Sequence, residues 1–369
     1  MKMTLILSND EVDQLLPMQV CLECLEETYA EVGSGRAVSR PRSDIYGAAD
    51  GNGRYVFKTM DGIVPKFEVA AIRLNSDIIQ WNVDKFGVRK DKQPLAPGGT
   101  WVGLVLLFST RTGEPLAIMP DGVMQRLRVA ATNALGVKYM AEEDASVYAL
   151  LGSGWQAGAQ AIAVAAVRPL KEIRVYSPTR DNRERLALEL RTSLGIQVTA
   201  VDDPRSAVDG ADIVGAATNS ITPVVELEWL KKSAHVTCVK VAELGAGILE
   251  NSGQVAVHTR LDRPTNYIVG QGEHPIYGHD PHEGLTESAR SARTGSATSE
   301  FDLTELPDLG DLVSGRISRA KSGSLTTFVN TLGTGVQFAA LGSLAYKFAR
   351  ERGLGREIPT EWLVETVHP

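Results

Sequence analysis

The sequence predicts an α/β protein built from a doubly wound parallel sheet and a second, discontinuous α+β unit. Two observations carry this prediction: apolar runs alternate with helical segments between residues 145 and 259, and a glycine-rich turn follows the first run. With 369 residues, the chain is long enough for two hydrophobic cores. Predicted strands cover residues 147–151, 172–177, 196–201, 211–217, 235–241 and 254–259. Predicted helices cover residues 155–167, 181–193, 204–209, 226–232 and 246–252.

The glycine-rich turn has the pattern Gly152-x-Gly154-x-x-Ala157, the G-x-G-x-x-G/A fingerprint of Rossmann folds. Gly152 permits a tight turn, Gly154 lets the backbone approach a pyrophosphate, and Ala157 lets the helix pack on its strand. The helix start offers free N–H groups and the positive end of its dipole to phosphates. We therefore expect this turn to bind a dinucleotide through Gly152, Gly154, Trp155, Gln156 and Ala157.

The first 140 residues follow a different pattern. An amphipathic helix over residues 10–31 precedes strands near 54–59, 68–74, 78–83 and 101–109, and Arg111-Thr-Gly-Glu114 predicts a hairpin turn. Residues 123–141 predict a helix leading into the parallel sheet, and residues 325–350 a second helix ended by Gly353. Because the second helix should pack on the N-terminal part, we expect one unit from residues 1–140 with 320–369 and another from residues 141–319.

Composition argues against several classes of partner. The net charge of −7 gives no basic surface of the kind that binds nucleic acid or anionic membranes. The longest mostly apolar stretch, residues 151–167, contains the glycine turn and is too short and polar to span a bilayer. The N-terminus lacks the pattern of a signal peptide, because Asn9, Asp10 and Glu11 follow a brief apolar run. We expect a cytoplasmic protein.

Cysteines and histidines give weak indications of metal chemistry. Cys21-x-x-Cys24 is compatible with a redox or zinc site, but it lies in the amphipathic segment without a second Cys/His pair, which favours two helix-borne cysteines. The irregular region 270–300 carries His274, His279 and His282 at spacings unlike a helical metal site. A surface loop is the preferred interpretation of this region, with a metal site or an active-site lid as alternatives. We predict no metal site.

Several segments together resemble the ornithine cyclodeaminase/mu-crystallin family. They are Gly113-Glu-Pro-Leu-Ala-Ile118, Arg126-Leu-Arg-Val-Ala-Ala-Thr-Asn-Ala-Leu135, residues 152–160, Ala211-Asp-Ile-Val214 and Ala217-Thr-Asn-Ser-Ile-Thr-Pro223. The resemblance covers residues 39–355. It implies an NAD(P)-dependent enzyme acting on an α-amino or α-imino acid, and a homodimer joined through the N-terminal unit. It also implies that the discontinuous unit binds substrate and that Thr218 and Asn219 contact the cofactor.

The resemblance also implies three cationic residues around the substrate. They are Arg42 after Pro41, Lys58 on the following strand, and Arg128 at the start of a helix. An arginine binds a carboxylate through bidentate hydrogen bonds, and a lysine near arginines has a lowered pKa that suits proton transfer. Small residues next to Arg128 favour a buried functional role over a solvated charge, and Arg40 is an alternative to Arg42.

Two acidic positions of the family are changed in this sequence. The aspartate expected after the fifth strand aligns with Ala242, so that only Glu243 could replace it as a substrate contact. The aspartate expected in the C-terminal helix aligns with Phe338. These losses argue against ornithine cyclisation and against a substrate with a distal ammonium group. Lys240 could instead bind a second acidic group on the substrate.

The end of the second predicted strand favours NADP(H) over NAD(H). An aspartate or glutamate there would bind the ribose hydroxyls and repel a 2′-phosphate. The segment carries no acid at this point, and Ser177, Thr179 and Arg180 could hold a phosphate, with Arg183 as a further ligand. The alternative is that the two arginines face water.

Together these features predict an NAD(P)H-dependent reductase or dehydrogenase acting on the C–N bond of an α-imino or α-amino acid. Arg42 and Arg128 would hold the substrate carboxylate and Lys58 would manage the proton. One alternative is a cyclodeaminase-type ammonia lyase that uses bound NAD catalytically. The other is a non-catalytic protein that binds NADP(H) or another ligand, as some crystallin-like relatives do.

Overall fold

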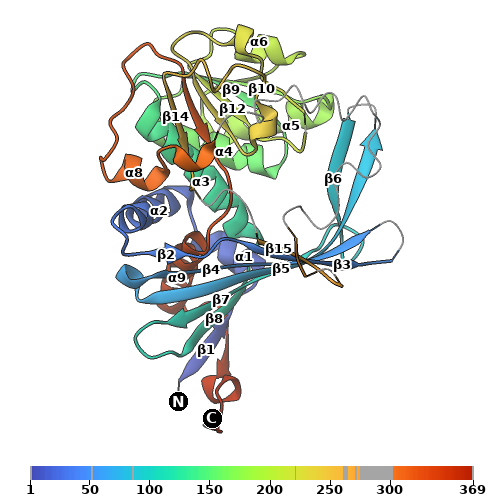
Figure 1. The fold of residues 1–369 in the computed structure, drawn as a ribbon, viewed down its shortest axis with the longest axis vertical. Helices are drawn as coiled ribbons and strands as arrows, with labels where there is room; N and C mark the ends of the chain where they lie inside the picture. Colours follow the sequence, from blue (N-terminus) through green and yellow to red (C-terminus); the bar gives the residue numbers. More distant parts are fainter. Residues whose placement is uncertain are drawn as a thin grey trace.

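The computed structural model describes residues 2–50, 53–84, 87–220, 222–260, 265–270, 272–274 and 302–367. Within these residues the strands form two sheets, one mixed with eleven strands and one parallel with seven. Helix α3 (Gly122–Met140) runs from the first sheet to the second (Figure 1).

The first sheet is assembled from both ends of the chain. Its order is β16 (Gly272–His274), β15 (Thr265–Ile268), β3 (Ser43–Ala48), β4 (Arg54–Val64), β5 (Val69–Asp84), β7 (Val102–Ser109), β8 (Pro115–Pro120), β1 (Met3–Ile6) and β18 (Arg356–Pro359). Two strands lie off this path: β2 (Val38–Ser39) pairs with β4, and β6 (Gly87–Gln93) pairs with β5. The hairpin predicted at residues 111–114 is confirmed as the connection between β7 and β8.

Alternation along β4 decides which side chains reach the site. Val56, Lys58, Met60 and Val64 are buried, whereas Tyr55 and Ile63 are exposed. The buried face is covered by α9 (Gly335–Arg352), which contacts β4 and β5. Side chains of a strand alternate between faces, so Lys58 points to the same side of the sheet as α9.

Two helices replace the single amphipathic helix predicted over residues 10–31. Helix α1 (Asn9–Leu15) begins with a capping box between Ser8 and Glu11 and ends before Pro17, where α2 (Met18–Gly33) begins. Proline has no N–H to continue the first helix, but it is suited to a helix start, so the chain turns here. Cys21 and Cys24 are free and buried on α2, which confirms the interpretation of two helix-borne cysteines.

The second sheet has the doubly wound topology predicted from the sequence. Its order is β11 (Gln197–Ala200), β10 (Glu172–Tyr176), β9 (Val147–Leu151), β12 (Ile213–Ala216), β13 (His235–Cys238), β17 (Thr326–Val329) and β14 (Gln254–Val257). Helices α4 (Trp155–Val167), α5 (Arg180–Leu194) and α6 (Pro204–Val208) confirm three of the predicted helices. The strand order reverses at β9, so the carboxyl ends of β9 and β12 form the expected ligand crevice.

The prediction was wrong about residues 325–350. The first of these residues form β17, which lies between β13 and β14 in the second sheet, and the helix starts only at Gly335. The β-branched and aromatic run Thr326-Thr-Phe-Val329 is fully buried and fills a gap in the sheet, so tertiary pairing decides its conformation. Two segments therefore belong to the other sheet than predicted. Strand β17 was assigned to the first unit but completes the second sheet. Strands β15 and β16 were assigned to the second unit but extend the first sheet.

Smaller differences concern segments where local patterns were ambiguous. The strands predicted at 68–74 and 78–83 form one strand, β5, because their alternation continues without a turn. The helix predicted at 226–232 is only a 3₁₀ turn over Leu227–Trp229, and residues 246–251 form turns instead of a helix. His274 lies in β16. His279, His282 and most of the segment 270–300, for which a surface loop, a metal site or a lid was considered, lie outside the described residues.

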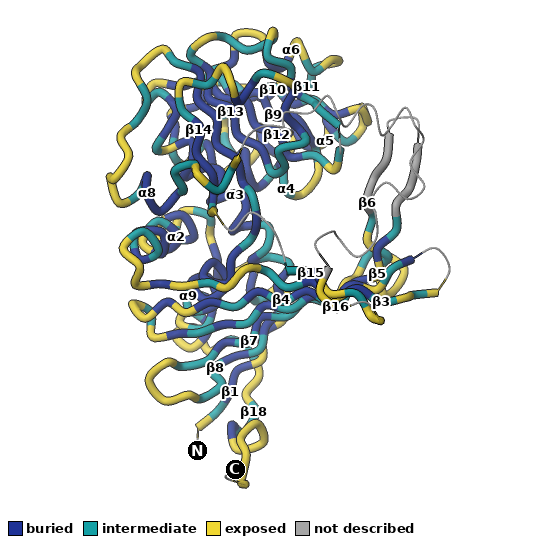
Figure 2. The backbone as a smooth tube through the Cα atoms, viewed as in Figure 1, coloured by how far each residue is buried: buried dark blue, intermediate teal, exposed yellow. Residues whose placement is uncertain are grey.

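Helix α3 is buried along most of its length, as the dark trace between the two sheets shows (Figure 2). Its carboxyl end is capped by Arg168, whose guanidinium donates to the backbone oxygens of Val137, Lys138, Ala141 and Glu142. Such capping satisfies carbonyls that the helix leaves free and favours the negative end of its dipole. Among the described helices, none combines the length and apolarity needed to cross a membrane.

Candidate active site

A cavity of about 320 Å³ lies where the first sheet, α3 and the carboxyl ends of the second sheet meet. Arg42, Lys58 and Arg128, the three predicted substrate residues, all line it, and so does Gln156 of the glycine-turn helix. Arg40 is instead exposed and paired with Asp61. The structure therefore brings together residues separated by more than a hundred positions in the chain.

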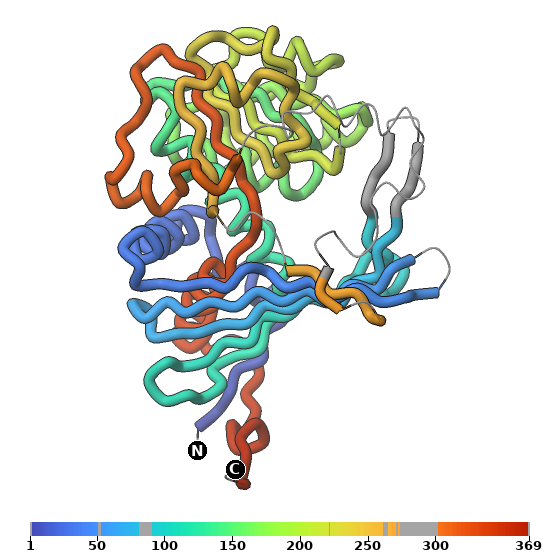
Figure 3. The backbone as a smooth tube through the Cα atoms, in the orientation of Figure 1, coloured from blue at the N-terminus to red at the C-terminus, as the bar shows by residue number. Residues whose placement is uncertain are grey.

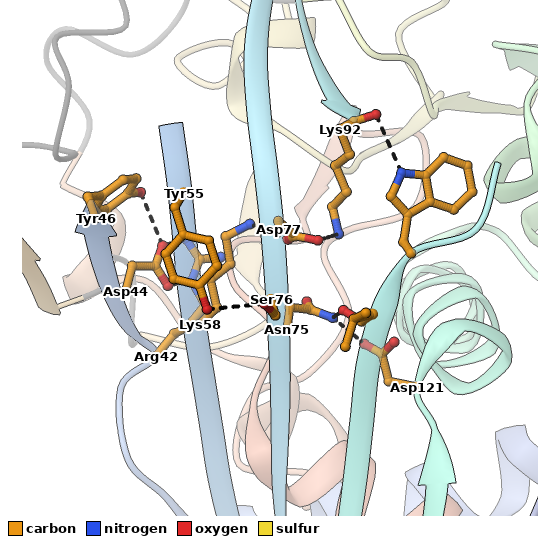
Figure 4. A network of polar contacts seen from close by, with 12 residues as sticks. Arg42, Asp44, Tyr46, Tyr55, Lys58, Asn75, Ser76, Asp77, Lys92 and Asp121 are labelled. Atoms are coloured by element: carbon orange, nitrogen blue, oxygen red, sulfur yellow. Dashed lines mark hydrogen bonds and ion pairs between the residues drawn. The ribbon is translucent and has the colours of Figure 1, made fainter. Parts of the chain in front are cut away.

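Lys58 is held in this cavity by strand register. It lies opposite Asp44 on β3 and opposite Asn75 on β5, and its Nζ donates to Asp77 Oδ2 at 3.0 Å (Figure 4). Asp77 also forms an ion pair with Lys92 at 2.9 Å. Burial lowers the pKa of Lys58; the negative charge of Asp77 offsets part of this effect and the positive charge of Lys92 adds to it. The result is a buried ammonium that can give up its proton more readily than a free lysine.

Two other cations of the cavity have carboxylate partners. Arg42 forms a bidentate pair with Asp44, with both N–O distances at 2.8 Å. Arg73 on β5 pairs with Asp121 at 2.6 Å, and Asn75 donates to the same carboxylate. Asp44 and Asp121 are buried, so the two pairs are fixed features of the cavity wall.

Arg128 has a different environment. It is 4% exposed, and its guanidinium donates to the side-chain oxygens of Gln125 and Gln337 at 2.8–3.0 Å. It forms no ion pair within the described part of the chain. Burial, and next the charge of Arg73, lower the pKa of Arg128. A buried guanidinium whose described hydrogen-bond partners are neutral is ready to bind an anion.

Phe338 and Gly333 shape the space around Arg128. The Phe338 ring lies between two guanidinium groups, 5.2 Å from that of Arg128 and 5.3 Å from that of Arg73. Its negative face interacts with cations without neutralising their charge. A Cβ at Gly333 would lie 2.6 Å from Arg128 Nη2, so a larger residue in this loop would require the guanidinium to shift.

Behind Arg128, a buried hydrogen-bond network fixes its orientation. Gln337 Oε1 accepts from Arg128 and from the backbone N–H of Thr334. Gln337 Nε2 donates to Tyr29 and Thr132, and the Tyr29 hydroxyl lies 2.7 Å from His258 Nε2. Burial lowers the pKa of His258 to about 3, so this imidazole is neutral at ordinary pH. All four hydrogen-bonding positions of the Gln337 amide are used, which fixes Gln337 Oε1 toward Arg128.

The glycine turn leads into α4, whose Gln156 lines the same cavity, whereas Ser153, Gly154 and Trp155 line a second cavity of about 590 Å³. Gly152 has φ +122°, and a Cβ there would lie 2.3 Å from the backbone oxygen of Ala217. Gly154 caps α4 without a side-chain hydrogen bond, and a Cβ there would meet no atom within 4 Å. The helix start is therefore open for a phosphate, and Ala157 is buried against the turn as predicted. Trp155 is exposed beside it.

The loops after β12 and β13 are joined by Glu243. Its buried carboxylate accepts from the backbone N–H groups of Thr218, Val239 and Lys240 and from the Thr218 hydroxyl, at 2.6–3.1 Å. The structure does not bring Glu243 to the cavity lining, where it was expected to contact substrate, because these donors hold it inside the loop. Lys240 Nζ likewise donates to the Ser220 backbone oxygen. Thr218 and Asn219 lie on this loop, shortly after the carboxyl end of β12.

The end of β10 carries no acidic side chain. Ser177 lies 2.7 Å from Ser153 of the glycine turn, Thr179 precedes α5, and Arg180 is exposed and paired with Glu184. Arg183 is buried and donates to the Ser177 backbone oxygen and to Asp202. Arg180 can therefore turn toward a ligand, whereas Arg183 braces the loop.

The family comparison agrees with this geometry. The family model described as "Ornithine cyclodeaminase/mu-crystallin family" matches residues 2–351. The chain belongs to this family. The predicted family and fold class are thereby confirmed.

Relatives of this chain include proteins named as cyclodeaminases and proteins named as reductases. An uncharacterized cyclodeaminase of Sinorhizobium fredii is 27% identical over 355 residues, covering 95% of this chain and 97% of the relative. A delta(1)-pyrroline-2-carboxylate reductase of Bacillus cereus is 26% identical over 261 residues, covering 69% of this chain and 74% of the relative. The structure of the Thermococcus litoralis delta(1)-pyrroline-2-carboxylate reductase in complex with NADH and L-proline superposes with a TM-score of 0.73 at 23% identity, covering 96% of this chain and all of that one.

This member of the ornithine cyclodeaminase/mu-crystallin family has further site residues that the motifs did not predict. Arg73, Asn75 and Asp77 occupy alternate positions of β5 and share one face with Lys58. The alternation of charged and polar residues in an otherwise apolar strand was the available signal, because a buried strand face rarely carries ionisable groups without a purpose. Lys92, Asp121 and Gln337 had no local signal, since only the tertiary fold brings them to the site.

Proposed function

We propose that the protein is an NAD(P)H-dependent reductase or dehydrogenase acting on the C–N bond of an α-imino or α-amino acid. The observation that carries this proposal is Arg128, a buried guanidinium whose hydrogen-bond partners among the described residues are all neutral, in one cavity with Lys58 and Gln156. A substrate carboxylate would supply the missing negative charge. Lys58 would lie close to the substrate nitrogen, and the glycine turn would place the cofactor on the opposite side.

Each residue of the cavity has a role in this proposal. Arg128 binds the substrate carboxylate, with Arg42 beside it, and thereby fixes the α-carbon. Lys58 Nζ donates a proton to the substrate nitrogen during reduction and recovers it from solvent, while Asp77 holds the ammonium in place. Gly154 and the start of α4 hold the pyrophosphate, and Gln156 separates that site from the substrate. The bound nicotinamide supplies the hydride.

We further propose NADP(H) as the preferred cofactor. Support comes from the acid-free end of β10, from Ser177, and from an exposed Arg180 whose only described carboxylate partner is on its own helix. The dissociation constants of NADPH and NADH, measured by quenching of tryptophan fluorescence, test this preference. Tighter binding of NADH would reverse it.

A homodimer through the first sheet is also proposed. Ile45, Tyr55, Ile78 and Tyr267 are partly exposed on the face opposite the site, and register places Ile45 beside Tyr267 and Tyr55 beside Ile78. Such an apolar stripe on an open sheet face favours burial against a second copy. Light scattering after size-exclusion chromatography is expected to give a dimer for the wild type and a monomer for Ile45→Asp.

The reaction is tested by following nicotinamide absorbance with pyruvate, glyoxylate, oxaloacetate and cyclic imino acids, the acyclic ones with ammonia or methylamine. Consumption of NAD(P)H that depends on the imino acid supports the proposal. Ammonia release from an amino acid without net change in the cofactor would indicate a cyclodeaminase instead. Cofactor binding without turnover on the whole panel would indicate a non-catalytic binding protein.

A further inference from the structure

Lys92 is a cation of the cavity that belongs to none of the sequence motifs. It lies on β6, which pairs with β5 off the main path of the first sheet and so forms an arm beside it. Register places Lys92 opposite Ile79, on the same face as Asp77 and Arg73. Its side chain is 42% exposed and its Nζ lies 2.9 Å from Asp77 Oδ1, beside the cavity that it lines with Lys58 (Figure 4).

The charges around the cavity do not balance. In the part of the chain that the structure describes, five cationic side chains line it, namely Arg42, Lys58, Arg73, Lys92 and Arg128. Among the described residues, three carboxylates pair with them: Asp44 with Arg42, Asp121 with Arg73, and Asp77 with both lysines. One positive charge is therefore unmatched at Arg128 and a second at the Lys58–Asp77–Lys92 group.

These two charges lie on different structural elements of one cavity, α3 and the β5–β6 arm. A substrate with a single carboxylate would neutralise only one of them. A substrate with a distal ammonium group would add a further positive charge, at an energetic cost in a partly buried site. A substrate with two carboxylates would match both.

We propose that the substrate is an α-imino or α-amino acid with a second carboxylate, and that Lys92 binds this distal group while Arg128 binds the α-carboxylate. The proposal rests on the proposed function and narrows its substrate class. Lys92 can turn from Asp77 to a ligand because its side chain is half-exposed and Lys58 remains bound to Asp77 at 3.0 Å. Lys240, considered from the sequence for the same task, is instead held by the Ser220 backbone oxygen.

The test compares oxaloacetate with pyruvate, each with ammonium chloride and saturating NADPH or NADH. The wild type is expected to prefer oxaloacetate in kcat/KM. Lys92→Gln should lower the ratio of kcat/KM for oxaloacetate to kcat/KM for pyruvate about 10- to 100-fold, the range for a lost charge-assisted hydrogen bond. Both substrates are measured at a pH where Lys58 is protonated in wild type and variant, so that the change in the pKa of Lys58 does not enter the ratio. Lys92→Arg should restore most of the preference. Lys66→Gln is the matched control, since Lys66 is also half-exposed and ion-paired, with Glu27, but lies outside the cavity.

Binding of succinate and propionate separates this proposal from the proposed function. Calorimetry on the NADP-loaded protein should show tighter binding of succinate to the wild type and similar binding of both acids to Lys92→Gln. The proposal is overturned, even if the protein is a reductase, by equal binding of the two acids to the wild type. It is also overturned if Lys92→Gln lowers kcat/KM for oxaloacetate and for pyruvate by the same factor. Tighter binding of succinate than of propionate, without reductase turnover, would support the dicarboxylate site and contradict the proposed reaction.

Discussion

The two walls of the proposed active site are built by different means. The proposed cofactor wall consists of backbone: a glycine at positive φ, an open helix start and a loop oxygen at close distance. The substrate wall consists of charged side chains from β3, β4, β5, β6 and α3. A backbone site can be damaged by adding atoms, whereas a site made of charges can be damaged without any change in shape. This difference gives two classes of variant with separate readouts.

The largest effect is expected from Arg128→Met on the substrate wall. Removing a buried charged partner from a complex costs about 2–5 kcal/mol, so kcat/KM should fall by about 1.5 to 3.5 orders of magnitude. The affinity for NADPH should stay unchanged, because no backbone of the glycine turn is altered. A parallel loss of NADPH binding and of the melting temperature would mean that Arg128 supports folding instead of substrate binding.

Next in size is Gly152→Ala on the cofactor wall. The added Cβ would lie 2.3 Å from the Ala217 oxygen at φ +122°, and such strain costs about 1–3 kcal/mol of unfolding free energy. We expect a lower midpoint of urea unfolding together with weaker NADPH binding. Gly154→Ala is the matched control: its Cβ meets no atom within 4 Å, so it should fold like the wild type and lose only cofactor affinity. Equal stability of the two variants would contradict the proposed strain at residue 152.

Gln337→Glu tests whether the neutrality around Arg128 matters. The new carboxylate would accept from Arg128 in place of the amide oxygen and compete with the substrate carboxylate. KM should rise about tenfold, as expected for the loss of roughly 1.4 kcal/mol, while kcat changes less. Gln14→Glu on the surface controls for the added charge. An unchanged KM would show that Arg128 does not bind the substrate carboxylate.

A pH profile tests Lys58. If its ammonium donates the proton, kcat for reduction falls as the pH rises through the pKa of Lys58, which burial places below that of a free lysine. Asp77→Asn removes the charge that raises this pKa, so the falling limb should move to lower pH. Lys92→Gln removes a charge that lowers it, so the limb should move to higher pH. Shifts in the same direction for both variants would exclude Lys58 as the titrating group.

The smallest effect is expected from Arg180→Gln. An exposed arginine contributes about 0.2–1 kcal/mol to an ion pair, so the dissociation constant of NADPH should rise only about two- to fivefold. The constant for NADH should not change. A matching change for NADH would mean that Arg180 contacts a part shared by both cofactors.

The same contrast explains how much the sequence could predict. The cofactor wall is encoded by consecutive residues, so the turn at 152–157 and its strand and helix were predicted with nearly correct bounds. Arg42, Lys58 and Arg128 were predicted only through the family resemblance. No local pattern predicted the carboxylates that pair with these cations, nor Lys92, nor Gln337. The places of these residues in the site depend on strand register and on α9.

Glu243 and β17 show two further limits. Glu243 was a reasonable substitute for a missing aspartate, but side-chain direction in a tight loop depends on which backbone N–H groups need an acceptor. The run before α9 was predicted as helix because its periodicity is compatible with both states. The run forms a strand because it pairs with β13 and β14, whose paired residues lie more than seventy positions earlier in the chain.

The position of β17 has a consequence for the order in which the molecule folds during synthesis. The second sheet lacks the strand between β13 and β14 until residue 329 has been made, and β18 joins the edge of the first sheet only when Met3 pairs with Pro359 (Figure 3). Pairings of such large sequence separation are slow to form, because loop closure must precede them. The last forty-odd residues thus complete both sheets and supply α9 and the loop over residues 330–333, so a nascent chain that ends before them has an unfinished second sheet and an unfinished substrate wall.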